Sequence, residues 1–256
     1  MGQLSWFCYQ LVLLIVMNAS IDIGNTHIKL GLFDKKKFVS AQQVDMESIV
    51  EKCREYGVVN AIVCSVGKNT DNILALLKLA CSGTVIQFGI NTKMPVKISY
   101  DSPNTLGMDR VAAGIGAYNM VSNKYNLVID VGSCITYDII SPDGVFLGGV
   151  ISPGIEMKLK AMSNLTAGLP LTKPDIDAEL IGKNTKACMK SGVWNGTLAE
   201  IEGFIRMFSK QFATLQVQIC GGYAEAVERS IKGDVLLEPN LVLIGLNTVL
   251  LENVNA

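Results

Sequence analysis

The sequence predicts an α/β protein in which two similarly built domains, each a mixed β-sheet flanked by helices, face each other across a cleft. Two observations support this fold class. The pattern apolar-Asp-apolar-Gly occurs twice, as IDIG at 21–24 and as IDVG at 129–132, about one small domain apart. Each copy is followed by an alternating strand and then by a similar order of strands and helices. A duplicated domain explains both observations.

The first domain is expected to span 17–120. Apolar and alternating runs predict strands at 13–24, 28–34, 37–44, 58–66 and 84–88. Helical periodicity predicts helices at 46–57 and 69–80, with Gly57 ending the first. An Ala- and Gly-rich helix follows within 108–125, and its small residues would allow close packing between the two halves.

The second domain is expected to span 121–256. It opens with a predicted hairpin, and a tight turn at Ser141–Gly144 leads into the third strand. The predicted strands lie at 126–133, 135–140, 145–151, 216–222 and 241–244. The predicted helices lie at about 154–163, 196–212, 223–231 and 245–253.

Composition and charge exclude several classes of function. The net charge is −1 and no basic patch stands out, so nucleic-acid binding has no electrostatic support. The seven cysteines form no CxxC pair, and the single histidine, His27, cannot complete a zinc site or a plausible Ser-His-Asp triad. We interpret the cysteines as reduced, mostly buried thiols of a cytosolic protein.

Residues 1–16 are interpreted as a non-native or disordered extension. The segment is apolar but lacks Lys and Arg, and its uninterrupted apolar run at 11–17 is shorter than the roughly 20 residues that span a bilayer. Met17 lies shortly before the first Asp-Gly motif and is a natural place for the chain to start. A weak signal anchor is the alternative, and no membrane partner is expected.

The two Asp-Gly motifs carry groups suited to phosphoryl transfer. Gly24 and Gly132 allow turns whose N–H groups bind phosphate, and nearby side chains add donors. Asp22 and Asp130 supply oxygens for a hydrated cation that bridges phosphates. Further donors come from Asn25, Thr26, Ser133 and Lys29. One such turn alone is ordinary hairpin chemistry, but two at domain spacing favour a nucleotide site.

Three further segments are ambiguous from the residues alone. The Gly-Gly pairs in LGGVISPG (147–154) and ICGGYAE (219–225) either admit phosphate and adenosine or end strands. Asp109 and Arg110 stand at the start of a predicted helix, where the Asp could accept a proton from a hydroxyl and the Arg could bind a carboxylate. The alternative is that the helix dipole favours Asp109 and that Arg110 is a surface charge.

Five motifs in this order resemble the type III pantothenate kinases, also called Bvg accessory factor-like proteins. The resemblance covers about 18–253 and rests on DIGNTHIK, GMDR, DVGSC, GGVISPG and GKNTKACMKSGVWNG. It implies the fold of the actin, sugar kinase and chaperone ATPase superfamily, with two RNase H-like domains. It also implies ATP-dependent phosphorylation of pantothenate to 4′-phosphopantothenate, the first step of coenzyme A synthesis, by a cytoplasmic homodimer that needs Mg²⁺ and K⁺ or NH₄⁺.

The resemblance also assigns roles to residues. It implies that Asp109 is the general base, that Asp130 binds the monovalent cation, and that Asp22 holds Mg²⁺ through the phosphates. It places ATP against Asp22, Ile23, Gly24, Asn25, Thr26, His27, Ile28, Lys29 and Ser133. It places pantothenate against Tyr100, Gly107, Met108, Asp109, Arg110 and Thr185. Ser133 stands where the family usually has Thr, which keeps the hydroxyl and loses a methyl group.

Two alternatives stay open at this point. One is a catalytically inactive regulatory relative, although the chain keeps Asp22, Asp109, Arg110 and Asp130. The other is a kinase that acts on another small hydroxy or carboxylate metabolite.

Overall fold

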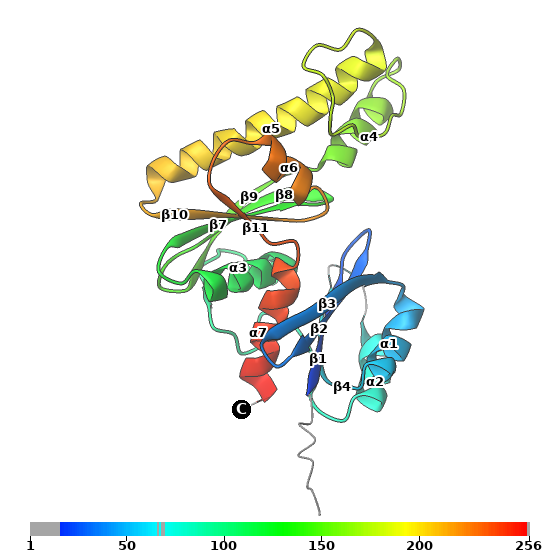
Figure 1. Cartoon of the computed structure of the whole chain (residues 1–256), viewed down its shortest axis with the longest axis vertical. Helices are drawn as coiled ribbons and strands as arrows, with labels where there is room; N and C mark the ends of the chain where they lie inside the picture. The colour runs from blue at the N-terminus through cyan, green and yellow to red at the C-terminus, as the bar shows by residue number, and fades with distance from the viewer. Residues whose placement is uncertain (1–15, 66, 68–69, 255–256) are drawn as a thin grey trace, which may run out of the picture.

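The structure, a computed structural model, describes residues 16–65, 67 and 70–254, and it contains two mixed sheets (Figure 1). The first sheet has the strand order β3-β2-β1-β4-β5. β1 pairs antiparallel with β2 and parallel with β4. Its strands are β1 (Met17–Ile23), β2 (Ile28–Asp34), β3 (Lys37–Val44), β4 (Val58–Ser65) and β5 (Val85–Gln87).

The second sheet repeats this arrangement. Its order is β11-β10-β7-β8-β9-β6, and β7 pairs antiparallel with β8 and parallel with β10, as β1 does with β2 and β4. Its strands are β7 (Tyr125–Val131), β8 (Cys134–Ile140), β9 (Val145–Pro153), β10 (Leu215–Cys220), β11 (Val235–Leu237) and the short β6 (Lys97–Ile98). The predicted duplication and the α/β fold class are therefore confirmed.

Helices cover the sheets on both faces (Figure 1). α1 and α2 pack against the first sheet, while α5 and α6 pack against the second. The described helices are α1 (Ile49–Glu55), α2 (Asp71–Ala80), α3 (Met108–Met120), α4 (Ile155–Leu165), α5 (Thr185–Gln211), α6 (Ala224–Ser230) and α7 (Leu241–Val254). Short 3₁₀ turns lie at Met46–Ser48 and Pro103–Thr105.

Strand alternation decides which residues face the space between the sheets. In β1, Ala19, Ile21 and Ile23 join the core under α1 and α2, so Asp22 lies on the opposite face. In β7, Ile129 joins the core shared with α5, so Asp130 also lies on the opposite face. The two repeats therefore direct equivalent carboxylates to the face that each sheet turns toward α3 and α7.

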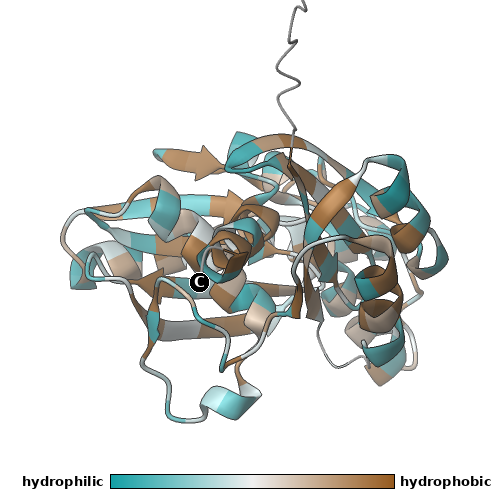
Figure 2. Cartoon of the chain, turned by 90° about the horizontal axis from the view of Figure 1, so that it is seen from below, coloured by the Kyte–Doolittle hydropathy of each residue, from teal (hydrophilic) through white to brown (hydrophobic). Residues whose placement is uncertain are grey.

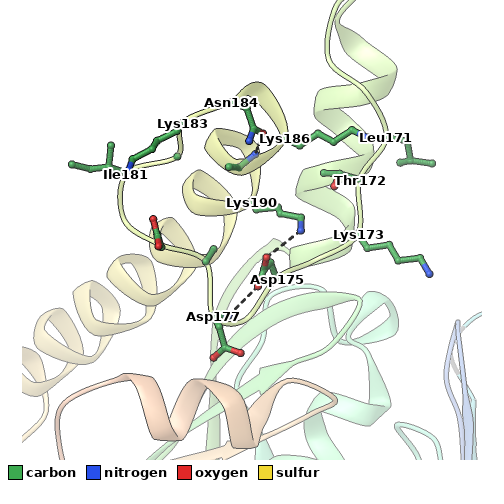
Figure 3. Close-up of a pocket in the computed structure, with 14 residues that line it drawn as sticks. Leu171, Thr172, Lys173, Asp175, Asp177, Ile181, Lys183, Asn184, Lys186 and Lys190 are labelled. Atoms are coloured by element: carbon green, nitrogen blue, oxygen red, sulfur yellow. Dashed lines mark hydrogen bonds and ion pairs between the residues drawn. The ribbon is translucent and has the colours of Figure 1, made fainter.

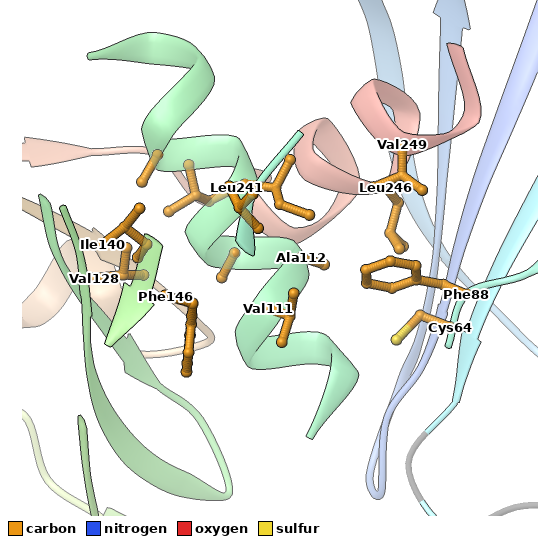
Figure 4. Close-up of a cluster of buried hydrophobic side chains, with 14 of the residues drawn as sticks. Cys64, Phe88, Val111, Ala112, Val128, Ile140, Phe146, Leu241, Leu246 and Val249 are labelled. Atoms are coloured by element: carbon orange, nitrogen blue, oxygen red, sulfur yellow. The ribbon is translucent and has the colours of Figure 1, made fainter. Parts of the chain in front are cut away.

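α3 and α7 form the layer that joins the sheets. Figure 4 shows their apolar side chains between Cys64 and Phe88 on the first-sheet side and Val128, Ile140 and Phe146 on the second-sheet side. Figure 2 shows hydrophobic residues concentrated along α7 and in the neighbouring strands. One continuous core thus holds both sheets in a fixed relation.

Glycines allow these two helices to approach closely. A Cβ at Gly245 would overlap the carbonyl oxygen of Ala112, and a Cβ at Gly116 would overlap the carbonyl oxygen of Leu241. Only residues without side chains permit backbone contact of this kind.

Buried amides attach α7 to the first sheet. Asn60 Nδ2 donates to Asn18 Oδ1 at 3.0 Å, and Asn18 Nδ2 donates to Asn247 Oδ1 at 3.3 Å. Asn247 Nδ2 in turn donates to the carbonyl oxygen of Lys35 at 2.8 Å. Leaving a buried amide without a hydrogen-bond partner costs free energy. This series of hydrogen bonds therefore fixes the position of α7 on β1 and β4.

Several predicted elements differ from the structure. The predicted strand at 241–244 is wrong, because these residues form the first turn of α7. The helix predicted at 196–212 begins earlier, at Thr185, and β6 and β11 were not predicted. The predicted extension lies mostly outside the described residues, as does the first part of the strand predicted at 13–24. Within the described ranges, no helix has both the length and the apolar character that crossing a membrane requires.

Candidate active site

Asp22 lies near the carboxyl end of β1, where the first hairpin turns. In the sheet it stands opposite Lys29 of β2 and Cys64 of β4. The turn that follows is closed by a hydrogen bond from the backbone N–H of Gly24 to the carbonyl oxygen of His27, at 3.1 Å. A carboxylate, an ammonium group and a tight turn thus lie together at the carboxyl end of β1, in the middle of the first sheet.

Asp130 occupies the equivalent place on β7. It stands opposite Thr136 of β8 and Cys220 of β10, and the following turn is closed by Gly132 N–H donating to the carbonyl oxygen of Cys134 at 3.0 Å. Gly221 after β10 has φ +98°, and a Cβ there would overlap a carboxylate oxygen of Asp130. The first glycine of the ICGG motif is therefore needed to leave room for Asp130.

The two hairpin turns touch each other. The hydroxyl groups of Thr26 and Ser133 lie 3.0 Å apart and share a hydrogen bond, although the residues belong to different sheets. Asn25, Thr26, His27 and Ser133 are exposed, so both turns are open to solvent where they meet. The arrangement presents two N–H-rich turns, one from each repeat, to the same point.

A third carboxylate comes from the start of α3. Gly107 caps this helix, and Asp109 Oδ1 accepts a hydrogen bond from the backbone N–H of Arg110 at 2.9 Å. The charge of Asp109 acts on both Asp22 and Asp130, so the three carboxylates share one electrostatic environment. The structure therefore brings together three acids that are far apart in the sequence.

This environment disfavours negative charge. Burial, together with the charges of Asp109 and Asp130, raises the pKa of Asp22 to about 7, and Lys29 opposes the rise. Burial and Asp109 raise the pKa of Asp130 to about 6, again against Lys29. A cation bound close to these acids would favour the ionised forms of Asp22 and Asp130.

One carboxylate oxygen supports a cation at this place. Oδ1 of Asp22 is buried and has no hydrogen-bond partner among the described residues. Within that part of the chain, no three His, Cys, Asp or Glu side chains converge tightly enough to hold a metal ion by themselves. The unpartnered oxygen of Asp22 fits a Mg²⁺ ion whose remaining ligands are phosphate and water oxygens.

Arg110 and Asp138 form a second polar group beside Asp109. Arg110 is buried, with 8% of its surface exposed, and forms an ion pair with the buried Asp138 of β8. The alternative that Arg110 is a surface charge is therefore wrong. Asp138 was not among the predicted site residues, although a single acid within the apolar strand ITYDII was a signal that could have identified it.

Thr185 lies apart from the other predicted site residues. It is the exposed first residue of α5, and the buried side chains of α5 join the core on the face of the second sheet that α3 does not contact. Figure 1 shows the start of α5 near α4, at the opposite end of the molecule from α1 and α2. Within one chain, the structure does not bring Thr185 to the three carboxylates.

A large cavity of about 720 Å³ lies near this end of α5 rather than at the carboxylates. Figure 3 shows its lysine-rich lining, in which Lys190 forms an ion pair with Asp175 at 3.1 Å. Asp22, Asp109 and Asp130 do not line this cavity. We therefore locate the candidate active site by its charges and turns, not by cavity volume.

The raised pKa values of Asp22 and Asp130 predict that the nucleotide-free protein loses stability as pH rises. Carboxyl groups in unfolded chains titrate near pH 4, so between about pH 4 and 7 the folded state binds more protons than the unfolded state. The free energy of unfolding is then expected to fall by about 4 kcal/mol from pH 5 to pH 8. Urea unfolding without Mg²⁺ measures this change.

Asp22→Asn is the matched control, because it cannot ionise. It is expected to remove much of the decrease between pH 5 and pH 8. Equal pH dependence in the parent and in Asp22→Asn would show that Asp22 titrates normally.

Comparisons with known proteins identify the family of this chain. The family model of type III pantothenate kinase matches residues 19–207. A protein of that name from Cytophaga hutchinsonii is 36% identical over 242 residues, which cover 93% of this chain and 100% of the relative. Another from Bacteroides fragilis is 37% identical over 238 residues, covering 91% of this chain and 97% of the relative.

Solved structures support the fold. A conserved Baf family protein from Campylobacter jejuni has a TM-score of 0.59 at 23% identity, with 93% of this chain and 100% of that chain covered. A ROK family glucokinase from Streptomyces griseus, solved with glucose and AMPPNP, has a TM-score of 0.50 at 12% identity, covering 92% and 99%. At these identities the likeness concerns the fold alone.

Proposed function

The chain belongs to the type III pantothenate kinase family and phosphorylates pantothenate, and we propose that Asp22, Asp109 and Asp130 form the centre of this reaction. The observation that carries the proposal is that Asp22 and Asp130 precede two hairpin turns that touch through Thr26 and Ser133, and that the charge of Asp109 acts on both acids. ATP is the phosphoryl donor, and the acceptor is a hydroxyl of pantothenate.

The two hairpin turns are proposed to hold ATP. The N–H groups and side chains from Asp22 to Lys29 would surround the phosphates, with Lys29 as a point charge and Ser133 as a hydroxyl donor. Asp22 would hold Mg²⁺ through its unpartnered oxygen, and Asp130 would bind K⁺ or NH₄⁺. Mg²⁺ supplies neutralisation of the phosphate charge, while the protein residues fix the position of the nucleotide.

Asp109 is proposed as the general base. A primary alcohol is a weak nucleophile, and the transition state for phosphoryl transfer is loose, so orientation of the hydroxyl and removal of its proton are the protein's main tasks. The carboxylate of Asp109 accepts that proton as the bond to phosphorus forms. Four neighbouring residues would hold pantothenate, namely Tyr100, Gly107, Met108 and Arg110.

We further propose that the active form is a cytoplasmic homodimer. Thr185 begins α5, on the far side of the second sheet from the three carboxylates, so a second copy would supply it. Large apolar side chains exposed near α4 and the start of α5 favour association there, namely Met157, Leu165, Leu171, Leu180 and Ile181. The six described cysteines are free thiols, which favours a reducing compartment.

The boundary between the domains is proposed at residue 120. The first domain would then span 17–120 and the second 121–256, each containing one Asp-Gly hairpin. α7 then packs against β1 of the first domain and α3 packs against β7 of the second, so each helix contacts the sheet of the other domain.

An acceptor panel tests the function. ADP release is measured with Mg²⁺, and K⁺ or NH₄⁺, over pantothenate, acetate, glycerol and glucose. Pantothenate is expected to exceed every other acceptor in kcat/KM by at least about 100-fold, because only it matches both Asp109 and Arg110. Preference for another acceptor would identify a different small-molecule kinase, and turnover of none would support a noncatalytic relative.

A further inference from the structure

Asp138 interacts with Arg110 more extensively than a single ion pair requires. Nε of Arg110 lies 3.1 Å from both carboxylate oxygens of Asp138, and Nη2 also donates to Oδ1. Asp138 is 1% exposed. These bonds occupy the Nε–Nη2 edge of the guanidinium group and leave the Nη1 donors unused by Asp138.

Two further contacts restrict the guanidinium group. Its central carbon lies 6.0 Å from the ring centroid of Phe146, and Tyr100 lies near enough to favour the charged form of the guanidinium group. Arg110 is therefore bounded by an acid, an aromatic ring and a phenol, which together select one orientation.

The Gly-Gly pair of β9 makes room for this arrangement. A Cβ at Gly149 would lie 2.6 Å from Oδ1 of Asp138 and would overlap the carbonyl oxygen of Tyr137. Gly148 has φ +97°, and a Cβ there would lie 3.4 Å from the ring of Tyr100. The motif GGVISPG thus begins with two glycines whose neighbours are Asp138 and Tyr100.

Arg110 contacts Asp109 as well as Asp138. Arg110 follows Asp109 in the first turn of α3, and its backbone N–H donates to the Asp109 carboxylate. Arg110 is thus bonded to Asp109 through its backbone and to Asp138 through its side chain.

We propose that Asp138 is a positioning residue that makes the site selective for acceptors carrying a carboxylate. By holding one edge of Arg110, it presents the other end of the guanidinium group to the acceptor's carboxylate. This inference rests on the proposed function and adds to it the residue that aims Arg110.

The test compares pantothenate with pantothenol, in which an alcohol replaces the carboxylate. For Asp138→Asn, KM for pantothenate is expected to rise about tenfold while KM for ATP stays within about twofold. The preference for pantothenate over pantothenol is expected to fall by about the same factor. A structural role alone would lower thermal stability without changing this preference.

Asn126→Ala is the matched control. Asn126 is also buried in the second sheet, and its amide donates to the carbonyl oxygens of Val121 and Lys124, away from Arg110. It should lower stability and leave the acceptor preference unchanged. If folded Asp138→Asn, checked by circular dichroism, keeps the parent preference, the inference is overturned.

A second variant covers the case in which Asp138→Asn does not fold. Arg110→Lys keeps a charge opposite Asp138 but has one ammonium group, which cannot bind Asp138 and a second carboxylate in the same planar geometry. It is expected to lose the preference for pantothenate, and retention would contradict the inference. The parent protein is assayed first, because absence of pantothenate turnover there would overturn the proposed function itself.

Discussion

Asp109→Asn is expected to lower kcat for pantothenate phosphorylation by at least about 100-fold. The amide is close to isosteric with the carboxylate and can still accept the N–H of Arg110, so the start of α3 should keep its shape. It cannot take the hydroxyl proton, and general-base catalysis is lost. Coupled detection of ADP at saturating substrates measures kcat, and calorimetry measures ATP affinity, which should stay near the parent value.

Asp22→Ala provides the contrast within the same site. It removes the oxygens proposed to hold Mg²⁺. Activity should therefore decline chiefly because Mg²⁺ and ATP bind more weakly, and excess Mg²⁺ should restore part of it. Parent-like turnover by Asp109→Asn would remove that residue as the base. Insensitivity of Asp22→Ala to Mg²⁺, with full activity, would place the metal elsewhere.

Gly245→Ala is expected to destabilise the protein strongly, because the added methyl group meets backbone rather than a movable side chain. A Cβ at this position would overlap the carbonyl oxygen of Ala112, so α7 and α3 must separate. Overpacking of this kind costs about 3 kcal/mol, and the higher helix propensity of Ala returns about 1 kcal/mol. The net decrease in the free energy of unfolding is therefore about 2 kcal/mol, measurable by urea denaturation.

Gly196→Ala is the matched control on α5. A Cβ there meets nothing within 4 Å, so only the propensity gain of about 0.5–1 kcal/mol remains. The same substitution in two helices should thus change stability in opposite directions. Equal effects at both positions would mean that the contact between α3 and α7 yields without cost.

Local patterns were sufficient to predict most of the fold. The hairpins were predictable because their strands alternate around Asp22 and Asp130, and the duplication because both patterns recur in the same order. LVLI at 241–244 misled because four apolar residues suit a buried strand and a buried helix equally. It lies in a helix whose sides are covered by both β1 and α3, which is a tertiary fact.

The candidate site was only partly predictable. Asp22 and Asp130 stand out by repetition, and Asp109 by its place before a helix. Asp138 stands out only as a lone acid in an apolar strand, and its ion pair with Arg110 could not be predicted because it depends on how β8 and α3 pack together. The duplication also held an unused signal, since Cys64 and Cys220 occupy the same position beside Asp22 and Asp130.

The covering of the first sheet by α7 has a consequence for biosynthesis. β1 and β4 are synthesised early. The amides of Asn18 and Asn60 and the apolar face beside them are covered by α7, which is synthesised much later. During translation the amino-terminal half therefore carries an uncovered surface that nascent-chain chaperones would shield. The hairpin that carries Asp22 can therefore complete its packing only after α7 has been synthesised.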